Sequence, residues 1–267
     1  MCHPARSTRY LGSAAFAALL AVGLAGCQTV ASSPDVTGSL NARAEAEPTG
    51  PSRSDIDALG ERHRANPRDT AAALQYGQAL RQNGQRQQAV AVLEQATIAN
   101  PGNKPLLAAY GRALADNGNF QQAFDILSRA HSPANPDWRI LSVQGTTLDQ
   151  QGKHEDARRY YMSALKIAPE EPSVLSNLGM SYILSKDLPK AEDALRRAYQ
   201  RGASDSRVRQ NLALAIGLQG RFAEAEAIVK ADLPADEAEA NVAYLKQMLG
   251  HEGRGSKTSA MAEPGRS

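Results

Sequence analysis

A period of 34 residues runs through the middle of the chain. Small residues recur at this interval in three series that stay in step with one another. The series are Gly77, Gly111, Gly145, Gly179 and Ala213; Ala89, Ala123, Ala157, Ala191 and Ala225; and Ala96, Ala130, Ala164 and Ala198, with Asp232 in the last unit. Five units follow without a gap, starting at Thr70, Lys104, Trp138, Pro172 and Ser206. This repeat predicts a stack of units that bury their apolar faces against one another.

Each unit reads as a helix, a turn and a second helix. Apolar residues recur at helical spacing in the first half of a unit, as at Ala73, Tyr76 and Leu80, so one face of that helix is buried. The second half carries the second Ala series, and Pro101 and Pro169 end it because proline cannot continue a helix. Between the halves, a left-handed turn residue is expected at Gly84, Gly118, Gly152 and Gly220. The predicted fold class is an all-α solenoid.

Several places depart from the pattern. Lys186 stands where the fourth unit should have its turn glycine, and the following Pro189 favours a different turn there. Gln144 and Arg209 occupy apolar places, and Asp232 replaces a small residue. From these substitutions we expect the stack to be less regular near its end.

The repeats leave room for end caps and two flanking segments. Ile56 and Leu59 fit the second half of an incomplete unit, and Val242, Leu245 and Leu249 fit a final capping helix. The predicted domains are a signal peptide over 1–26, a disordered tether over 27–53, a solenoid with caps over 54–249 and a disordered tail over 250–267.

The start of the chain has the features of a bacterial secretory signal. Arg6 and Arg9 precede an apolar run from Ala14 to Leu24, which is too short and too rich in Ala to favour a spanning helix. Leu24, Ala25, Gly26 and Cys27 resemble the lipobox of bacterial lipoproteins, which implies lipidation of Cys27. Acyl chains would then tether the chain to a bilayer. The alternative is an ordinary signal peptide with an incidental cysteine.

The lipoprotein resemblance also bears on location. In that family an Asp after the lipidated Cys retains the protein at the inner membrane, whereas this chain has Gln28. The resemblance therefore implies a protein anchored by lipid in the cell envelope, at the outer membrane and facing the periplasm.

Charge composition argues against nucleic-acid partners. The signal peptide contains two arginines and no acid, so the rest of the chain balances 28 Lys plus Arg against 28 Asp plus Glu. A general binder of nucleic acid or of anionic lipid is expected to carry a basic excess.

No residue pattern predicts catalysis, a cofactor or a metal site. After the signal, histidines stand at His63, His131, His154 and His251, with no pair at one-turn spacing, and each is expected to be a surface or turn residue. The segment from Gly250 comes near a phosphate-binding loop, but Ser256 interrupts the motif. We therefore predict that the chain is not an enzyme.

The period and the small residues at these places are similar to the tetratricopeptide repeat, over residues 70 to about 235. This resemblance implies that the first helices of successive units line a groove that holds an extended peptide or a helix of a protein partner. The family's groove places carry over to Gln78, Arg81, Arg112, Asp149, Asn177, Met180, Asn211 and Leu214.

Some of these groove residues allow two interpretations. Asn177 and Asn211 match a family asparagine that bonds a peptide backbone, or they bond only locally. The apolar set from Met180 to Leu218 is either an open patch for a partner's hydrophobic segment or the seat of the capping helix. Arg112, with Arg139, either clasps an acidic residue of a partner or is solvated.

The combination of lipobox, short tether and consecutive repeats resembles the TadD family of Tad/Flp pilus assembly. The resemblance implies an adaptor that supports pilus secretion, with a secretin or other pilus components as partners. Two alternatives remain: a factor for assembly of outer-membrane proteins or of a type IV pilus secretin, and an accessory module of a cell-wall enzyme. No segment outside the repeats is long enough for an enzyme domain.

Overall fold

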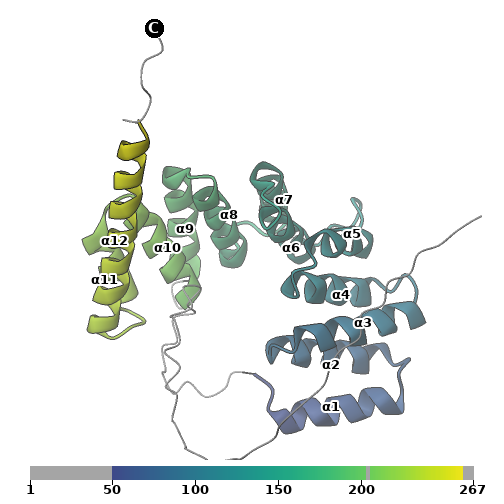
Figure 1. Ribbon diagram of the computed structural model, residues 1–267. Coiled ribbons are helices and arrows are strands. Elements are labelled where there is room, and N and C mark those ends of the chain that lie inside the picture. The colour runs from purple at the N-terminus through teal and green to yellow at the C-terminus, as the bar shows by residue number, and fades with distance from the viewer. Residues whose placement is uncertain (1–49, 203–204, 261–267) are drawn as a thin grey trace, which may run out of the picture. The chain divides into compact units, whose positions relative to one another are not determined.

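The computed structural model describes residues 50–202 and 205–260, and these residues form twelve α-helices and no strand (Figure 1). The helices are α1 (Arg53–Ala65), α2 (Thr70–Gln82), α3 (Arg86–Ala99), α4 (Lys104–Asp116), α5 (Phe120–Ala130), α6 (Trp138–Asp149), α7 (His154–Ile167), α8 (Pro172–Leu184), α9 (Leu188–Gly202), α10 (Ser206–Leu218), α11 (Phe222–Val229) and α12 (Ala235–Ala260). Within this part of the chain, no helix has both the length and the apolar character needed to cross a membrane. The signal, the lipobox and most of the tether lie outside the described residues.

The five predicted units are confirmed as five helix pairs, from α2 and α3 to α10 and α11. The first helices begin at the five residues that start the units in the sequence. Each first helix packs on its own second helix and also on the first helix of the next unit. The first helices α2, α4, α6, α8 and α10 thus form one continuous row, and we call their shared surface the first-helix face.

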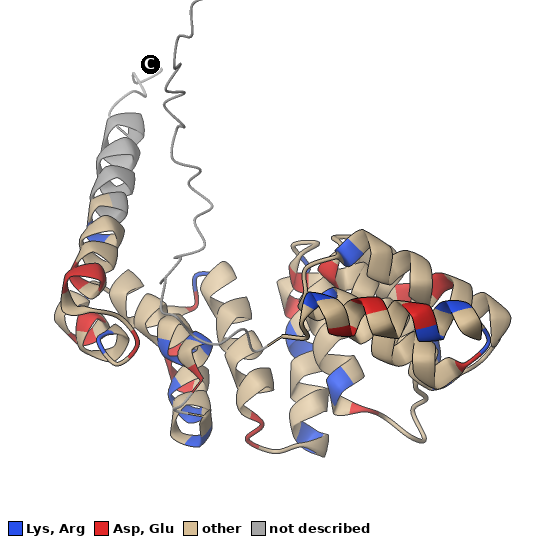
Figure 2. Ribbon diagram, turned by 90° about the horizontal axis from the view of Figure 1, so that it is seen from below, with Lys and Arg blue, Asp and Glu red and all other residues tan. Residues whose placement is uncertain are grey.

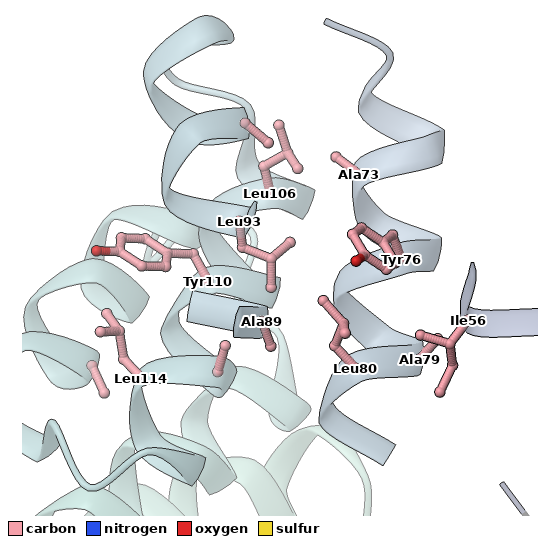
Figure 3. Packing of buried hydrophobic residues seen from close by; sticks show 13 residues of the cluster. Ile56, Ala73, Tyr76, Ala79, Leu80, Ala89, Leu93, Leu106, Tyr110 and Leu114 are labelled. Carbon is pink, nitrogen blue, oxygen red and sulfur yellow. The ribbon is translucent and has the colours of Figure 1, made fainter. Parts of the chain in front are cut away.

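Close contact within each pair explains the series of small residues. A Cβ atom added at Gly77, Gly111, Gly145 or Gly179 would come within 2.4–2.6 Å of a Leu or Tyr side chain of the second helix. Each of these large side chains fills the space that its glycine leaves open. Between units 1 and 2, Leu93 and Leu106 continue the same core, which extends to Ile56 of α1 (Figure 3).

The turns within the units share one geometry, and the different turn that we predicted at Lys186 is wrong. Gly84 has φ +74°, and Lys186 has φ +60°. The amide of the next residue donates to a carbonyl five residues back in both turns: Gln85 to Leu80 and Asp187 to Tyr182, each at 2.9 Å. Lys186 therefore adopts the left-handed conformation at a cost of about 1 kcal/mol, because packing on both sides fixes the turn.

Two polar residues stand at repeat positions that are apolar in the other units, and each forms hydrogen bonds with neighbouring side chains. Gln144 is fully buried and bonds Ser128 and His131 of the preceding unit. Arg209 donates from Nε to Asp232 at 2.8 Å, so the two departures in the fifth unit compensate each other. The end of the stack is therefore held by an ion pair where earlier units use an apolar contact.

Capping helices are present at both ends of the repeats. Helix α1 packs on α2, and Tyr76 lies against Gly60. Helix α12 packs on α10 and α11. It continues to Ala260, beyond the tail boundary predicted at Gly250, because glycine lowers helix stability but can adopt helical backbone angles. Residues 261–267 of the predicted tail lie outside the described residues.

Candidate peptide-binding surface

A loop between the second and third units interrupts the regular stacking. Helix α5 ends at Ala130, whereas α3 and α7 are each three residues longer. Pro133 and Pro136 explain the difference, because proline and the residue before it disfavour helical continuation. The amide of Asn135 donates to the carbonyl of Ser132 at 3.0 Å and tightens the loop. This loop closes one side of a cavity.

The cavity, which we call the basic pocket, has a volume of about 550 Å³ and lies on the first-helix face of units 1 to 3. Three first helices and the loop contribute to it. Its lining residues are Leu74, Gln78, Arg81, Lys104, Pro105, Ala108, Ala109, Arg112, Ala130, His131, Asn135, Asp137, Arg139 and Ile140. Of the predicted groove residues, the structure brings Gln78, Arg81 and Arg112 together here.

The acids near the basic pocket already have partners. Arg81 donates from Nε to Asp116 at 2.6 Å. Asp137 accepts from the amide of Arg139 at 2.8 Å and caps the start of α6. The Arg139 guanidinium lies 4.4 Å from the centre of the Trp138 ring, as a cation–π contact. Both carboxylates thus have hydrogen-bond partners of their own, although the charge of each also raises the pKa of Arg112.

Arg112 and Lys104 form no ion pair with any residue that the structure describes. Arg112 is half-buried at the pocket wall. Burial is the main cause that lowers the pKa of Arg112, and the charges of Arg81 and Arg139 lower it further, while the charges of Asp137 and Asp116 raise it in part. An arginine keeps its proton at neutral pH even so. The pocket thus holds a partly desolvated positive charge that forms no ion pair within the described residues, although Asp137 and Asp116 act on it by their charge.

His131 anchors the loop to the third unit. Its Nε2 lies 3.1 Å from the side-chain oxygen of Gln144, whose amide donates to Ser128 at 2.9 Å. The Nδ1 atom of His131 is buried and has no hydrogen-bond partner in the described part of the chain. His63 is also buried, 5.9 Å from the ring of Tyr76 between ring centres. Our prediction of a surface or turn residue is therefore wrong for His63, whereas His131 is half-buried and stands in the loop after α5.

Asp149 does not belong to the binding surface, contrary to our prediction. Its side chain is only 6% exposed and accepts hydrogen bonds from Tyr161 at 2.9 Å and Ser181 at 2.8 Å. His154 Nδ1 lies 2.9 Å from the same carboxylate. Burial, followed by the charge of Asp149, raises the pKa of Tyr161. Asp149 therefore joins the third unit to the fourth, because its side chain turns into the contact between α6, α7 and α8.

The two asparagines bond along the row of first helices. Asn177 donates to Ser142 Oγ at 3.1 Å, and Asn211 donates to Ser176 Oγ at 3.0 Å. Both asparagines line a smaller cavity of about 120 Å³ between α8 and α10. Their amide nitrogens thus bond locally, while the side-chain oxygens make no hydrogen bond within the described residues. A role in holding a peptide backbone stays a prediction.

The apolar set of the later units is covered only in part. Helix α12 lies on α10, with Leu245 opposite Gly217, and Val242 packs against the core there. No contact joins α12 to α8 among the described residues, so Met180 and Leu184 are not covered by the cap. Leu184 is 50% exposed, and Leu214 is half-buried.

The sequence interpretation missed several residues of the basic pocket. Lys104 and Asp137 were overlooked because they stand at the starts of helices rather than at the family's groove places. The available signal was the pair of prolines between α5 and α6, which marks a longer loop than in other units. Within the described residues, no group of three His, Cys, Asp or Glu side chains could hold a metal ion.

Comparison with known families identifies the class of repeat. Models described as tetratricopeptide repeat match residues 80–144, 143–206 and 207–231, which together make up more than half of the chain. The chain therefore belongs to the tetratricopeptide repeat family. It is a scaffold for protein interactions, as proteins of this family are. No curated protein sequence matches the chain significantly.

Solved structures show the same fold at low sequence identity. PilW, described as a widely conserved type IV pilus biogenesis factor, aligns with a TM-score of 0.61 and 20% identity, over 71% of this chain and 90% of that one. The complex of Cut9 and Hcn1 from the APC/C aligns with a TM-score of 0.60 and 15% identity, over 72% of this chain. This chain spans only 39% of the Cut9–Hcn1 chain that it matches. These likenesses show the solenoid fold.

Proposed function

We propose that this chain is an outer-membrane lipoprotein adaptor that supports assembly of a Tad/Flp-type pilus secretion machine. It binds its protein partner on the first-helix face. The observation that carries the binding part is the basic pocket, in which Arg112 is half-buried and neither it nor the exposed Lys104 forms an ion pair within the described residues. A buried or half-buried charge is costly without a partner, so this surface is built to receive one.

The pocket is of a suitable size for part of a polypeptide. A volume of about 550 Å³ accommodates a few side chains rather than a folded domain. The row of first helices continues from the pocket to the smaller cavity at Asn177 and Asn211. An extended segment of a partner could therefore contact several units in succession.

Anchoring rests on the sequence before the repeats. Leu24, Ala25, Gly26 and Cys27 follow the lipobox pattern, and Gln28 lacks the acidic side chain of the inner-membrane retention signal. Lipidation at Cys27 would hold the scaffold at the membrane through its acyl chains. The segment between Cys27 and α1 would give the repeats reach into the periplasm.

The proposed partners are a secretin or other components of the pilus machine. A second candidate is a factor for assembly of a type IV pilus secretin or of outer-membrane proteins. The likeness to PilW favours that candidate, since most of the PilW chain aligns. At 20% identity this likeness is one of fold, so it does not displace the first proposal.

Two measurements test the proposal. Cys27→Ser should move the protein from the membrane to the soluble periplasmic fraction, and Cys2→Ser is the matched control because Cys2 lies within the predicted signal. Unchanged membrane fractionation of Cys27→Ser would contradict lipid anchoring.

Deletion of the chain should reduce secretin multimers in the outer membrane and abolish pilin secretion. Normal levels of both would rule out the pilus role. A general loss of outer-membrane proteins would instead support the second candidate.

A further inference from the structure

We infer that the solenoid bends at a hinge between units 2 and 3, so that α1–α5 and α6–α12 move as two rigid bodies. The basic pocket lies across this contact between successive units, with Lys104 and Arg112 on α4 and Ile140 on α6. Bending there would widen or narrow the first-helix face at the pocket. The inference concerns the repeats alone, so it does not depend on the proposed pilus role.

The chain between units 2 and 3 restrains their angle less than the chain at neighbouring contacts does. Residues 100–103 connect α3 to α4 and residues 168–171 connect α7 to α8, whereas the longer segment 131–137 connects α5 to α6. Helix α5 also ends three residues earlier than its counterparts α3 and α7. The last helical turn that would lie beside the next unit is therefore missing.

Side-chain bonds tie the first helices of other units together but not α4 and α6. Asn177 of α8 donates to Ser142 of α6 at 3.1 Å, and the same bond recurs between α10 and α8 at 3.0 Å. One repeat earlier, these two places hold Val143 and Ala108, whose side chains form no hydrogen bonds. An ion pair ties α2 to α4. Within the described residues, no hydrogen bond or ion pair between side chains joins α4 to α6.

The buried contact that crosses from unit 2 to unit 3 is partly polar. Gln144 is 1% exposed and stands at the place that Leu178 occupies in the next unit. The amide of Gln144 donates to Ser128, so its oxygen accepts from Nε2 of His131 at 3.1 Å. Nδ1 of the neutral ring is then an acceptor, and it is buried without a partner in the described part of the chain. Opening the contact would hydrate this atom, which lowers the cost of bending here.

An apolar cluster beside the pocket keeps the two bodies attached. Ile140 of α6 packs with Leu107 of α4 and Leu127 of α5. Next to this cluster, the basic pocket leaves about 550 Å³ of unfilled volume on the first-helix face. A packed cluster can serve as a pivot, and free volume beside it gives the helices room to approach.

Charge does not fix the angle between the two bodies. Over the repeats, basic and acidic residues are interspersed rather than gathered into blocks of one sign (Figure 2). The net charge of the whole chain is only +2. Long-range repulsion or attraction between the bodies is therefore small, and the contacts between units 2 and 3 decide how far the solenoid bends.

Spin labels on the second helices provide the test, with distances measured by double electron–electron resonance. One exposed place recurs in all five units, at Ala91, Asp125, Arg159, Asp193 and Ala227. Cys2→Ser and Cys27→Ser remove both native cysteines. Each variant of the purified whole chain then carries only the two cysteines introduced for labelling.

Two labelled pairs span the hinge: Ala91→Cys with Arg159→Cys, and Asp125→Cys with Asp193→Cys. Both should give broad distance distributions, because a rotation of about 15° moves a label about 20 Å from the hinge by roughly 5 Å. The matched control, Arg159→Cys with Ala227→Cys, is also two units apart but does not span the hinge. Its distribution should be narrow.

The three pairs also locate the bend. Equal widths for all three pairs would overturn the inference. A broad distribution for only one of the two spanning pairs would place the bend between other units and would overturn it as well.

A variant that restores the missing bond between α4 and α6 sharpens the test. Ala108→Ser with Val143→Asn copies the bonded places of the next units and should narrow both broad distributions towards the control width. The same change one repeat earlier, Leu74→Ser with Ala109→Asn, should leave the pair at positions 125 and 193 broad. Circular dichroism and thermal melting show whether each variant folds. Unchanged widths in a folded Ala108→Ser, Val143→Asn variant would contradict a hinge that the first helices control.

Discussion

Units 1 to 3 and units 4 and 5 have the same helix-pair architecture but use their charges differently. In the later units, arginines pair with acids between and within helix pairs: Arg221 of the fifth unit reaches Glu192 of the fourth at 2.7 Å, and Arg209 reaches Asp232 within the fifth unit. In the earlier units, Arg81 pairs with Asp116, but Lys104 and Arg112 form no ion pair on the first-helix face among the described residues. Within one fold, paired arginines thus stabilise the stack, whereas unpaired ones are available for a ligand.

Tyrosines take the place of these ion pairs in the early units. Tyr76 accepts a hydrogen bond from Gln88 at 3.0 Å, and Tyr110 donates to Glu94 at 3.1 Å. Burial, with the hydrogen bond to Glu94, raises the pKa of Tyr110 to about 12. The early units are therefore held largely by apolar packing and tyrosine hydrogen bonds, with an ion pair between Arg81 and Asp116, and Arg112 takes part in no ion pair within the described residues.

The largest effect is expected from breaking the ion pair in the fifth unit. Arg209→Ala should lower the free energy of unfolding by about 3 kcal/mol, because it leaves Asp232 buried without its cation. Both side chains are 13% exposed or less. Urea unfolding of the purified chain measures the change.

The matched control restores the repeat pattern. The double variant Arg209→Leu with Asp232→Ala should recover most of the lost stability, because a well-packed apolar pair can replace a buried ion pair. A double variant no more stable than Arg209→Ala would show that the pair is not a unit.

A second variant probes the close contact that both regions share. Gly145→Leu should destabilise the chain by about 1–3 kcal/mol or more, because even a Cβ atom would come within 2.5 Å of Tyr161. Ala91→Leu on the exposed side of α3 is the control and should change little. A wild-type melting temperature for Gly145→Leu would contradict the packing register.

Acid should affect the later units through Glu192. Burial raises the pKa of Glu192, but hydrogen bonds from Arg221, Gln219 and Arg196 outweigh burial and lower it to about 2. Because the folded-state pKa lies below the unfolded value of about 4.3, the stabilisation is complete above that value and is lost as the pH falls towards 2.

Glu192→Gln should remove about 1–2 kcal/mol of stability at neutral pH and flatten the loss between about pH 5 and pH 2. Unfolding followed across this range checks the expectation. An unchanged acid profile in Glu192→Gln would show that this network contributes nothing.

The smallest effect on stability is expected at Arg112. Arg112→Leu should leave the free energy of unfolding within about 0.5 kcal/mol of the wild type or raise it slightly, because the native side chain has no ion pair to lose. The contrast with Arg209→Ala sharpens the distinction between the two regions. A loss as large as that of Arg209→Ala would mean that Arg112 is structural.

The periodic part of the fold could be predicted from the sequence, and the exceptions could not. Glycine spacing located the unit starts because a contact like that of Gly145 with Tyr161 repeats in the first four helix pairs. The left-handed Lys186 was missed because the surrounding packing overrides the preference of the residue itself.

Three of the predicted groove residues meet in the basic pocket, while Asp149 does not reach it. Its burial depends on Tyr161 and Ser181, whose hydrogen bonds cross between helices and cannot be read from one helix alone. Lys104 joins the pocket only because the loop after α5 closes beside it. The repeat positions that line the groove in the family thus predict which helix face binds a partner. Tertiary contacts decide which side chains on that face remain available for binding.

The most direct test places a photoreactive amino acid at Gln78, which is exposed and lines the basic pocket. Illumination of intact cells, followed by mass spectrometry, should yield a specific protein adduct that disappears when Arg112→Met is added. The same amino acid at Gln87, exposed on α3, should give no such adduct. Equal adducts at the two positions, or an adduct at position 78 that persists in Arg112→Met, would contradict recognition of a protein partner by this pocket.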